Sequence, residues 1–138
     1  MDAAALQATL DRIAADYVKR LQLRVETVAP GEVTLTMPVL PELVHGGGVL
    51  CGQAIMSAAD TAMLLAMIAQ LGEFRPMTTV QLQTSFVRPV PKDAMSVAVN
   101  ARVLRFGKSL SYGLVDFTMR DGKLAAHATT TYSLLAPS

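Results

Sequence analysis

Tryptophan is absent from this 138-residue sequence, cysteine occurs once, and aromatic residues make up only 5% of it. A single cysteine excludes an internal disulfide and a zinc site built from cysteines. Charged residues are few, at 17%, and the formal net charge is +1, so global electrostatics predict no nucleic-acid or membrane-surface partner. Hydrophobic residues, in contrast, make up 51% of the chain, which predicts one folded domain over residues 1–138.

The N-terminal segment has no basic region followed by a long apolar run. No secretory signal is visible, and we therefore expect a cytoplasmic protein. Residues 2–20 are predicted to form one amphipathic helix, with Asp2 as its N-cap. Its apolar face is formed by residues at helical spacing, namely Leu6, Leu10, Ile13 and Tyr17.

Alternation of apolar and polar residues predicts strands in two parts of the chain. A hairpin over residues 24–37 turns at Pro30-Gly31. In the second half, one strand over residues 79–87 is expected to place Val80, Leu82 and Phe86 on its apolar face. Three further strands form an antiparallel meander, at residues 95–105, 110–119 and 124–135.

Residues 50–71 are predicted to form a long helix that is apolar almost all the way round, after the glycine-rich loop at residues 46–48. Such a helix is buried in a large core or in a membrane. The central Asp60 disfavours the membrane, because an aspartate there costs about 2.5–3.5 kcal/mol on insertion scales. We expect an α+β fold in which five to six antiparallel strands wrap around this helix and leave one of its faces for a second chain.

Asp60 is the first candidate functional residue. An ionised carboxylate in apolar surroundings is costly unless it is paired or hydrogen-bonded. Keeping one in this helix therefore indicates a function, although a carboxylate that caps a neighbouring loop is the structural alternative.

A family resemblance rests on three segments. Asp60-Thr61-Ala62-Met63, with Gly52 upstream, is followed by Phe86-Val87-Arg88-Pro89 and by the turn Phe106-Gly107-Lys108. Together they resemble the hotdog-fold acyl-CoA thioesterases of the phenylacetate-pathway type, over roughly the whole chain from residue 21 onward. The resemblance implies hydrolysis of an acyl-CoA to the free acid and CoA. It implies no metal, no cofactor beyond the CoA of the substrate, and a homodimer or a dimer of dimers.

The resemblance also implies roles for individual residues. Asp60 corresponds to the carboxylate that acts as nucleophile or general base, and Gly52 to the glycine whose N–H polarises the thioester carbonyl. Thr78 corresponds to a serine or threonine that helps to hold the nucleophile or water. Two positions depart from the pattern, since Cys51 replaces a frequent histidine and His45 a frequent asparagine. We expect His45 to orient water or the thioester carbonyl.

Four residues are candidates for substrate binding. Cys51 and Gln53 flank Gly52, and Arg88 and Lys108 lie near strand ends, where they are placed to hold the phosphates of CoA. Three of these residues also have a structural explanation without a binding role. Arg88 and Lys108 would then be solvated surface charges, and Cys51 a small buried thiol.

The spacing between Gly52 and Asp60 limits how both residues can act on one substrate. Gly52 and Asp60 are eight residues apart, which is about 12 Å along a helix. One carbonyl carbon cannot lie within about 3 Å of both groups in the same chain. If both act, they come from different chains, with two helices antiparallel across a twofold axis.

Other functions stay open at this stage. A non-catalytic acyl-CoA binding module on the same fold is favoured by the two departures at Cys51 and His45 and disfavoured by Asp60. A hotdog dehydratase, with His45 facing Asp60, is a third candidate. Within the thioesterase hypothesis, attack by Asp60 through an anhydride and activation of water by Asp60 are both compatible with the sequence.

Overall fold

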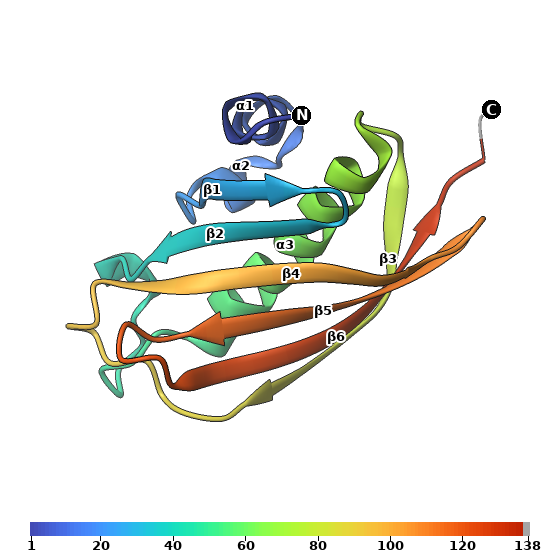
Figure 1. The fold of residues 1–138 in the computed structure, drawn as a ribbon. Helices are drawn as coiled ribbons and strands as arrows, with labels where there is room; N and C mark the ends of the chain where they lie inside the picture. The colour runs from blue at the N-terminus through green and yellow to red at the C-terminus, as the bar shows by residue number, and fades with distance from the viewer. Residues whose placement is uncertain (137–138) are drawn as a thin grey trace.

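The fold is a six-stranded antiparallel sheet wrapped around one long helix (Figure 1), in a computed structural model that describes residues 1–136. The strands are β1 (Arg24–Ala29), β2 (Glu32–Pro38), β3 (Met77–Phe86), β4 (Ser96–Phe106), β5 (Leu110–Thr118) and β6 (Leu124–Leu134). Their order is β1-β2-β4-β5-β6-β3, so β1 and β3 form the two edges of the sheet. The predicted hotdog architecture is confirmed, and the last two residues of the predicted domain lie outside the described part.

The central helix α3 (Gly52–Leu71) begins two residues later than predicted, with Cys51 as its N-cap, and ends at Gly72 in the left-handed conformation. Its small side chains, among them Ala54, Ala58 and Ala62, are buried against the sheet. By length and composition α3 is able to span a membrane, but most of it is buried inside the protein, as is usual for a core helix. As expected, the sheet leaves one face of the helix uncovered in the single chain. One stripe is open, formed by Gln53, Met56, Ser57, Asp60 and Leu64.

The helix lies close to the sheet because Gly113 of β5 has no side chain. A Cβ atom at this position would lie 2.8 Å from the methyl carbon of Met63 and 2.9 Å from the main-chain oxygen of Arg102. Met63 is three residues from Asp60, on the next turn of α3. The glycine therefore fixes the height of this part of the helix above the sheet.

The predicted single helix over residues 2–20 is wrong. The structure has α1 (Ala3–Ile13), with Asp2 as its N-cap, and a short α2 (Asp16–Lys19), separated by the extended Ala14 and Ala15. The break turns the chain so that Leu21 and Leu23 enter the core. Tyr17, expected on the apolar face, is exposed instead, and its hydroxyl lies 2.9 Å from the Ser57 hydroxyl on α3.

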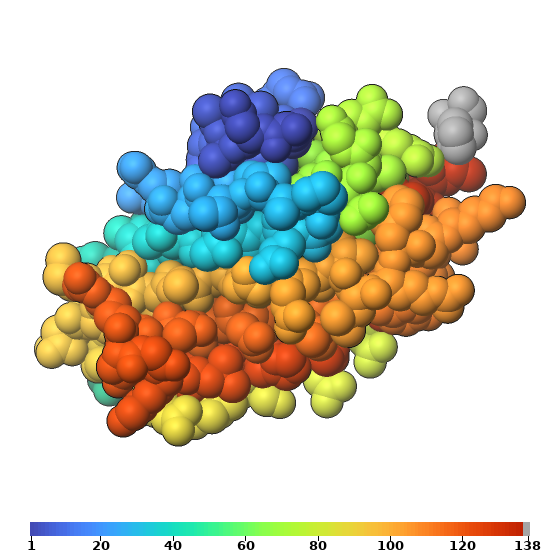
Figure 2. Space-filling model, viewed as in Figure 1, coloured from blue at the N-terminus to red at the C-terminus, as the bar shows by residue number. Residues whose placement is uncertain are grey.

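The N-terminal helix also covers one edge of the sheet (Figure 2). The amide of Val25 in β1 donates to the side-chain oxygen of Gln7, and the side-chain nitrogen of Gln7 donates to the carbonyl of Leu23, at 2.8 and 3.3 Å. The Gln7 side chain thus occupies hydrogen-bonding positions that an added strand would use. A bulge at Glu26 further disrupts this edge.

The opposite edge, β3, contains a bulge that the alternation of residues in the sequence does not predict. Thr79 pairs with Tyr132 and Gln81 with Thr131, so Val80 is the extra residue. Val80 was expected on the apolar face, but it is 57% exposed. One inserted residue reverses the inward and outward alternation on the two sides of the bulge. Residues before Val80 therefore face the opposite way from the regular prediction.

We predict that Gly113→Ala destabilises the protein by about 1–3 kcal/mol, because the added methyl group overlaps a rigid main-chain oxygen and the end of Met63. Urea unfolding followed by circular dichroism measures this loss. Gly46→Ala is the matched control, since a Cβ at Gly46 meets nothing within 4 Å. Equal stability of the two variants would contradict the close helix–sheet contact.

Candidate active site

Asp60 is half-buried on the open stripe of α3 and is hydrogen-bonded by two hydroxyl groups. Thr79 of β3 donates to Oδ1 at 2.6 Å, and the Tyr132 hydroxyl of β6 lies 2.7 Å from the same oxygen. Within residues 1–136, no hydrogen bond reaches Oδ2. The carboxylate is thus held on one oxygen and free on the other.

The threonine that contacts Asp60 is Thr79, whereas the family resemblance implied Thr78. The bulge at Val80 is the cause, because it turns Thr79 toward α3. Thr78 pairs with Ser133, next to the Thr79–Tyr132 pair and on the other face of the sheet. In this chain the expected contact between Thr78 and Asp60 is therefore replaced by one from its neighbour.

Tyr132 is a functional candidate that sequence reasoning missed. It is buried on the face of β6 that packs toward α3. Its side chain is only 4% exposed. Its hydroxyl also lies 2.7 Å from the main-chain oxygen of Asp60, so one hydrogen is shared between two acceptors of the same residue. Burial, followed by the negative charge of Asp60, raises the pKa of Tyr132, so the group stays protonated and acts as a donor.

A second group of candidates lies at the N-terminus of α3. Gly52 is the first residue of the helix, where main-chain N–H groups have no partner within the helix. Cys51 makes no side-chain cap to these amides, and its own N–H donates to the Leu43 carbonyl at 2.8 Å. The first turn of α3 therefore presents free donors and the positive end of the helix dipole.

A cavity of about 280 Å³ opens beside Gly52. Its buried residues are Leu50, Ile55 and Val90, and its exposed residues include Phe86, Val87 and Arg88. The Phe86 ring packs directly on the glycine, because a Cβ at Gly52 would lie 3.3 Å from the ring. The cavity is close to the lower limit of typical ligand pockets, which run from about 300 to 1,000 Å³.

His45 lines the same cavity, in a tight turn of the glycine-rich loop. The Gly47 N–H donates to His45 Nδ1 at 2.8 Å. A ring nitrogen that accepts this bond carries no hydrogen, so in the neutral imidazole the hydrogen is on Nε2. His45 is thereby set up as a hydrogen-bond donor through Nε2.

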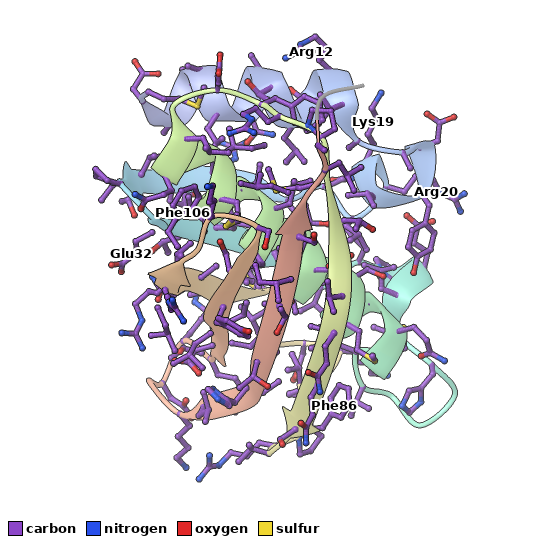
Figure 3. All side chains as sticks on the ribbon, turned by 90° about the vertical axis from the view of Figure 1, so that its right-hand side faces the viewer. Arg12, Lys19, Arg20, Glu32, Phe86 and Phe106 are labelled. Carbon is purple, nitrogen blue, oxygen red and sulfur yellow. The ribbon has the colours of Figure 1, made fainter. Side chains whose placement is uncertain are left out.

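The expected substrate-binding residues are not all brought together in one chain. Gln53 lies on the open stripe of α3, one residue after Gly52. Arg88 lines the cavity and donates from Nη1 to the Leu124 carbonyl at 2.8 Å. Lys108 lies in the β4–β5 turn, two residues from Phe106, and Figure 3 shows Phe106 and Phe86 at opposite ends of the sheet. Lys108 is thus remote from Arg88 within the chain.

The site residues form two clusters, one around Gly52 and His45, the other around Asp60. The helix separates them by eight residues, or about 12 Å at its rise per residue. The first cluster offers donors for a developing negative charge, and the second offers a carboxylate for attack or proton removal. In the described part of the chain, no three His, Cys, Asp or Glu side chains are grouped as a metal site.

The fold and the site together indicate the class of protein. A sheet wrapped around one helix, with a carboxylate and a free helix N-terminus on its open side, is the hotdog class. The model of the thioesterase superfamily matches residues 47–126, which is more than half of the chain. The chain belongs to the thioesterase superfamily, and this membership supports hydrolysis of a thioester in general terms.

Three known proteins illustrate the likeness. A protein of Thermoplasma volcanium, named as a putative esterase, is 30% identical over 120 residues, covering 86% of each chain. The structure of a conserved protein of Pseudomonas aeruginosa is 26% identical, with a TM-score of 0.83 over 91% of this chain and 98% of the other. The E. coli PaaI protein of the phenylacetic acid degradation operon has a TM-score of 0.84 over 99% and 95%, at 19% identity.

We predict that Tyr132 makes the folded protein sensitive to alkaline pH. Its folded-state pKa lies above the usual 10.0, so its contribution to stability is complete below pH 10 and is lost as the pH rises further. The loss from this group is about 1.4 kcal/mol for each pH unit above 10.

Urea unfolding of the wild type and Tyr132→Phe between about pH 9 and 11.5 tests this, since other groups that titrate there cancel in the difference. We expect the phenylalanine variant to lose less stability with rising pH. Parallel curves for the two proteins would show that the Tyr132 hydroxyl is not held protonated.

Proposed function

We propose that this protein hydrolyses an acyl-CoA thioester, and that each active site is shared by two copies of the chain. Asp60 of one chain attacks the thioester carbonyl or removes a proton from water. The Gly52 N–H of the other chain donates to the carbonyl oxygen as it becomes negative. The observation that carries the proposal is the Asp60 carboxylate, the one charged side chain of a mainly apolar helix, held by two hydroxyl donors.

The cluster around Gly52 supports the oxyanion role. The first-turn amides of α3 are free, and a glycine lets a ligand approach the main chain closely. His45 adds a second donor, because the Gly47 N–H fixes its hydrogen on Nε2. Preorganised donors of this kind are worth about 10²–10³ in turnover each.

The edges of the sheet support a twofold dimer through β3. Edge strands that avoid association carry charges, prolines, bulges or a cover. β1 has a charged residue at Arg24, a bulge at Glu26 and the cover provided by Gln7. β3 is ten residues long and has a bulge, but its sequence contains neither a charged residue nor a proline. It is therefore the edge suited to pair with a second copy.

The internal contacts of one chain favour a particular register for that pairing. Gly52 packs on Phe86, and Asp60 is bonded to Thr79. The midpoint on the helix is Met56, and the midpoint on β3 is Gln83, because the extra residue Val80 takes no place in the ladder between Thr79 and Phe86. A twofold axis through both midpoints puts Gly52 opposite the partner's Asp60. The same axis brings Lys108 of one chain to the end of the dimer where the partner's Arg88 lies, as the binding of CoA phosphates by both would require.

We predict that Asp60→Asn lowers turnover of a CoA thioester by about 10³-fold or more, because amide nitrogen and oxygen neither attack nor remove a proton at a useful rate. Release of free thiol across a panel of acyl-CoA substrates measures this. Asp116→Asn is the matched control, since Asp116 is also half-buried and hydrogen-bonded, to His127 at 2.6 Å, on the other face of the sheet.

Binding without thiol release by the wild type would favour the acyl-CoA binding module and remove the enzyme proposal. If turnover is found, a single turnover in isotopically labelled water separates the two chemistries. Label in the Asp60 carboxylate indicates an anhydride that water opens at the aspartyl carbon, whereas activation of water by Asp60 places label in the acid product alone.

A complementation experiment tests whether the site is shared. Gly52→Pro removes the N–H at the first helical position, where the proline backbone is tolerated, and the exposed Phe86 ring, 3.3 Å from a Cβ at Gly52, must shift to admit the proline ring. Cys51, which precedes it, already has the extended conformation that a following proline favours, with φ −70° and ψ 148°. We expect Gly52→Pro and Asp60→Asn homodimers to be inactive.

Random mixing of the two variants makes half of the dimers mixed, and each mixed dimer has one intact site of two. We therefore expect about a quarter of wild-type activity to return after co-refolding. Mixing two batches of the same variant is the control. No recovery from the mixture would place Gly52 and Asp60 in the same chain or exclude one of them from the reaction.

A further inference from the structure

We propose that Tyr132 is a positioning residue which, together with Thr79, holds Oδ1 of Asp60 and so assigns the reaction to Oδ2. The inference rests on the proposed function, because it describes how the carboxylate of that site is aimed. Neither Tyr132 nor Thr79 contacts the substrate in this account. Both act through Asp60.

The first support is the convergence of two strands on one oxygen of Asp60. Thr79 comes from β3 and Tyr132 from β6, and both hydroxyls lie within 2.7 Å of Oδ1. Charge-assisted bonds between a hydroxyl and a carboxylate are short and about twice as strong as neutral ones. Two such bonds leave Oδ1 with little capacity to attack, while Oδ2 receives none among the described residues.

The second support is that Tyr132 holds the side chain and the main chain of Asp60 together. Its hydroxyl lies 2.7 Å from the Asp60 carbonyl oxygen as well as from Oδ1. A donor placed between these two acceptors restricts rotation of the Asp60 side chain. The buried tyrosine ring is itself fixed by packing, so the carboxylate is tied to a rigid part of the sheet.

The third support is the direction of the free oxygen. Asp60 belongs to the open stripe of α3, whereas Tyr132 and Thr79 approach it from the sheet. An oxygen that is held from the sheet side leaves the other available on the open side. That is the side on which the substrate and the partner's Gly52 are placed by the proposed dimer.

A tyrosine that only anchors the helix to the sheet would give the same contacts, so the test must separate anchoring from aiming. We expect Tyr132→Phe to lower kcat by about a hundredfold, the loss associated with a misplacement of about 1 Å, and to change KM by less than about twofold. Tyr112→Phe, at an exposed tyrosine on β5, is the matched control.

Thr79 provides a second pair of variants, in case Tyr132→Phe does not fold. Thr79→Ser keeps the hydroxyl and is expected to retain turnover, whereas Thr79→Val keeps the shape and is expected to lose about tenfold or more. A double mutant adds the sharpest readout. In an Asp60→Asn background, Tyr132→Phe is expected to cause no further loss of kcat, because its effect passes through the carboxylate.

Two results would overturn the inference while leaving the proposed function intact. One is an unchanged kcat in Tyr132→Phe with only a lower unfolding temperature, which would indicate an anchor. The other is an additive loss in the double mutant. Full activity of Asp60→Asn alone would instead remove the proposed function, whatever the tyrosine variants do.

Discussion

The structure depends on one electrostatic requirement: a carboxylate on an apolar helix must be given hydrogen-bond donors. Without them, burying even part of an ionised Asp60 would cost several kcal/mol. The donors come from β3 and β6, which lie side by side at one end of the sheet. The sheet must therefore curl far enough to bring its last two strands under the middle of α3. The curvature that defines the fold and the environment that defines the site are thus the same geometric feature.

Much of this architecture could be predicted from local patterns. Strand alternation and the apolar run over residues 50–71 correctly predicted the sheet and the central helix, because burial repeats with the period of each element. The contacts of Asp60 could not be predicted in the same way. Tyr132 is separated from it by 72 positions, and nothing in the alternation of β6 distinguishes a tyrosine that bonds from one that only packs. The bulge at Val80 was also invisible, since Val80, Leu82 and Phe86 alternate regularly in the sequence. Because of this bulge, Thr79 faces Asp60 in place of Thr78.

The N-terminal segment, beside the β1 edge, is a second case in which a local pattern failed to predict the structure. A continuous helix over residues 2–20 satisfied the apolar spacing, but Tyr17 on that helix would have to be buried, and the core instead takes Leu21 and Leu23. Breaking the helix at Ala14 frees the chain to enter β1, while α1 stays beside the edge and closes it with Gln7. The choice between burying Tyr17 and burying Leu21 and Leu23 cannot be read from local helical spacing, because it depends on which side chains the core can accept. The result is a sheet with one covered edge and one uncovered edge.

Gly52 joins these constraints at the other end of α3. As the first helical residue it has a free N–H, and the absence of a Cβ allows the Phe86 ring to pack against it. Phe86 belongs to β3, the same strand that supplies Thr79 to Asp60. One strand therefore supports both clusters of the site, at positions that the helix keeps about 12 Å apart. A rigid helix cannot shorten that separation, and the strand beside it holds Phe86 at one cluster and Thr79 at the other. Chemistry that needs both clusters at one carbonyl must then be completed by a second chain, and the strand best suited to bind that chain is the one that contacts both clusters.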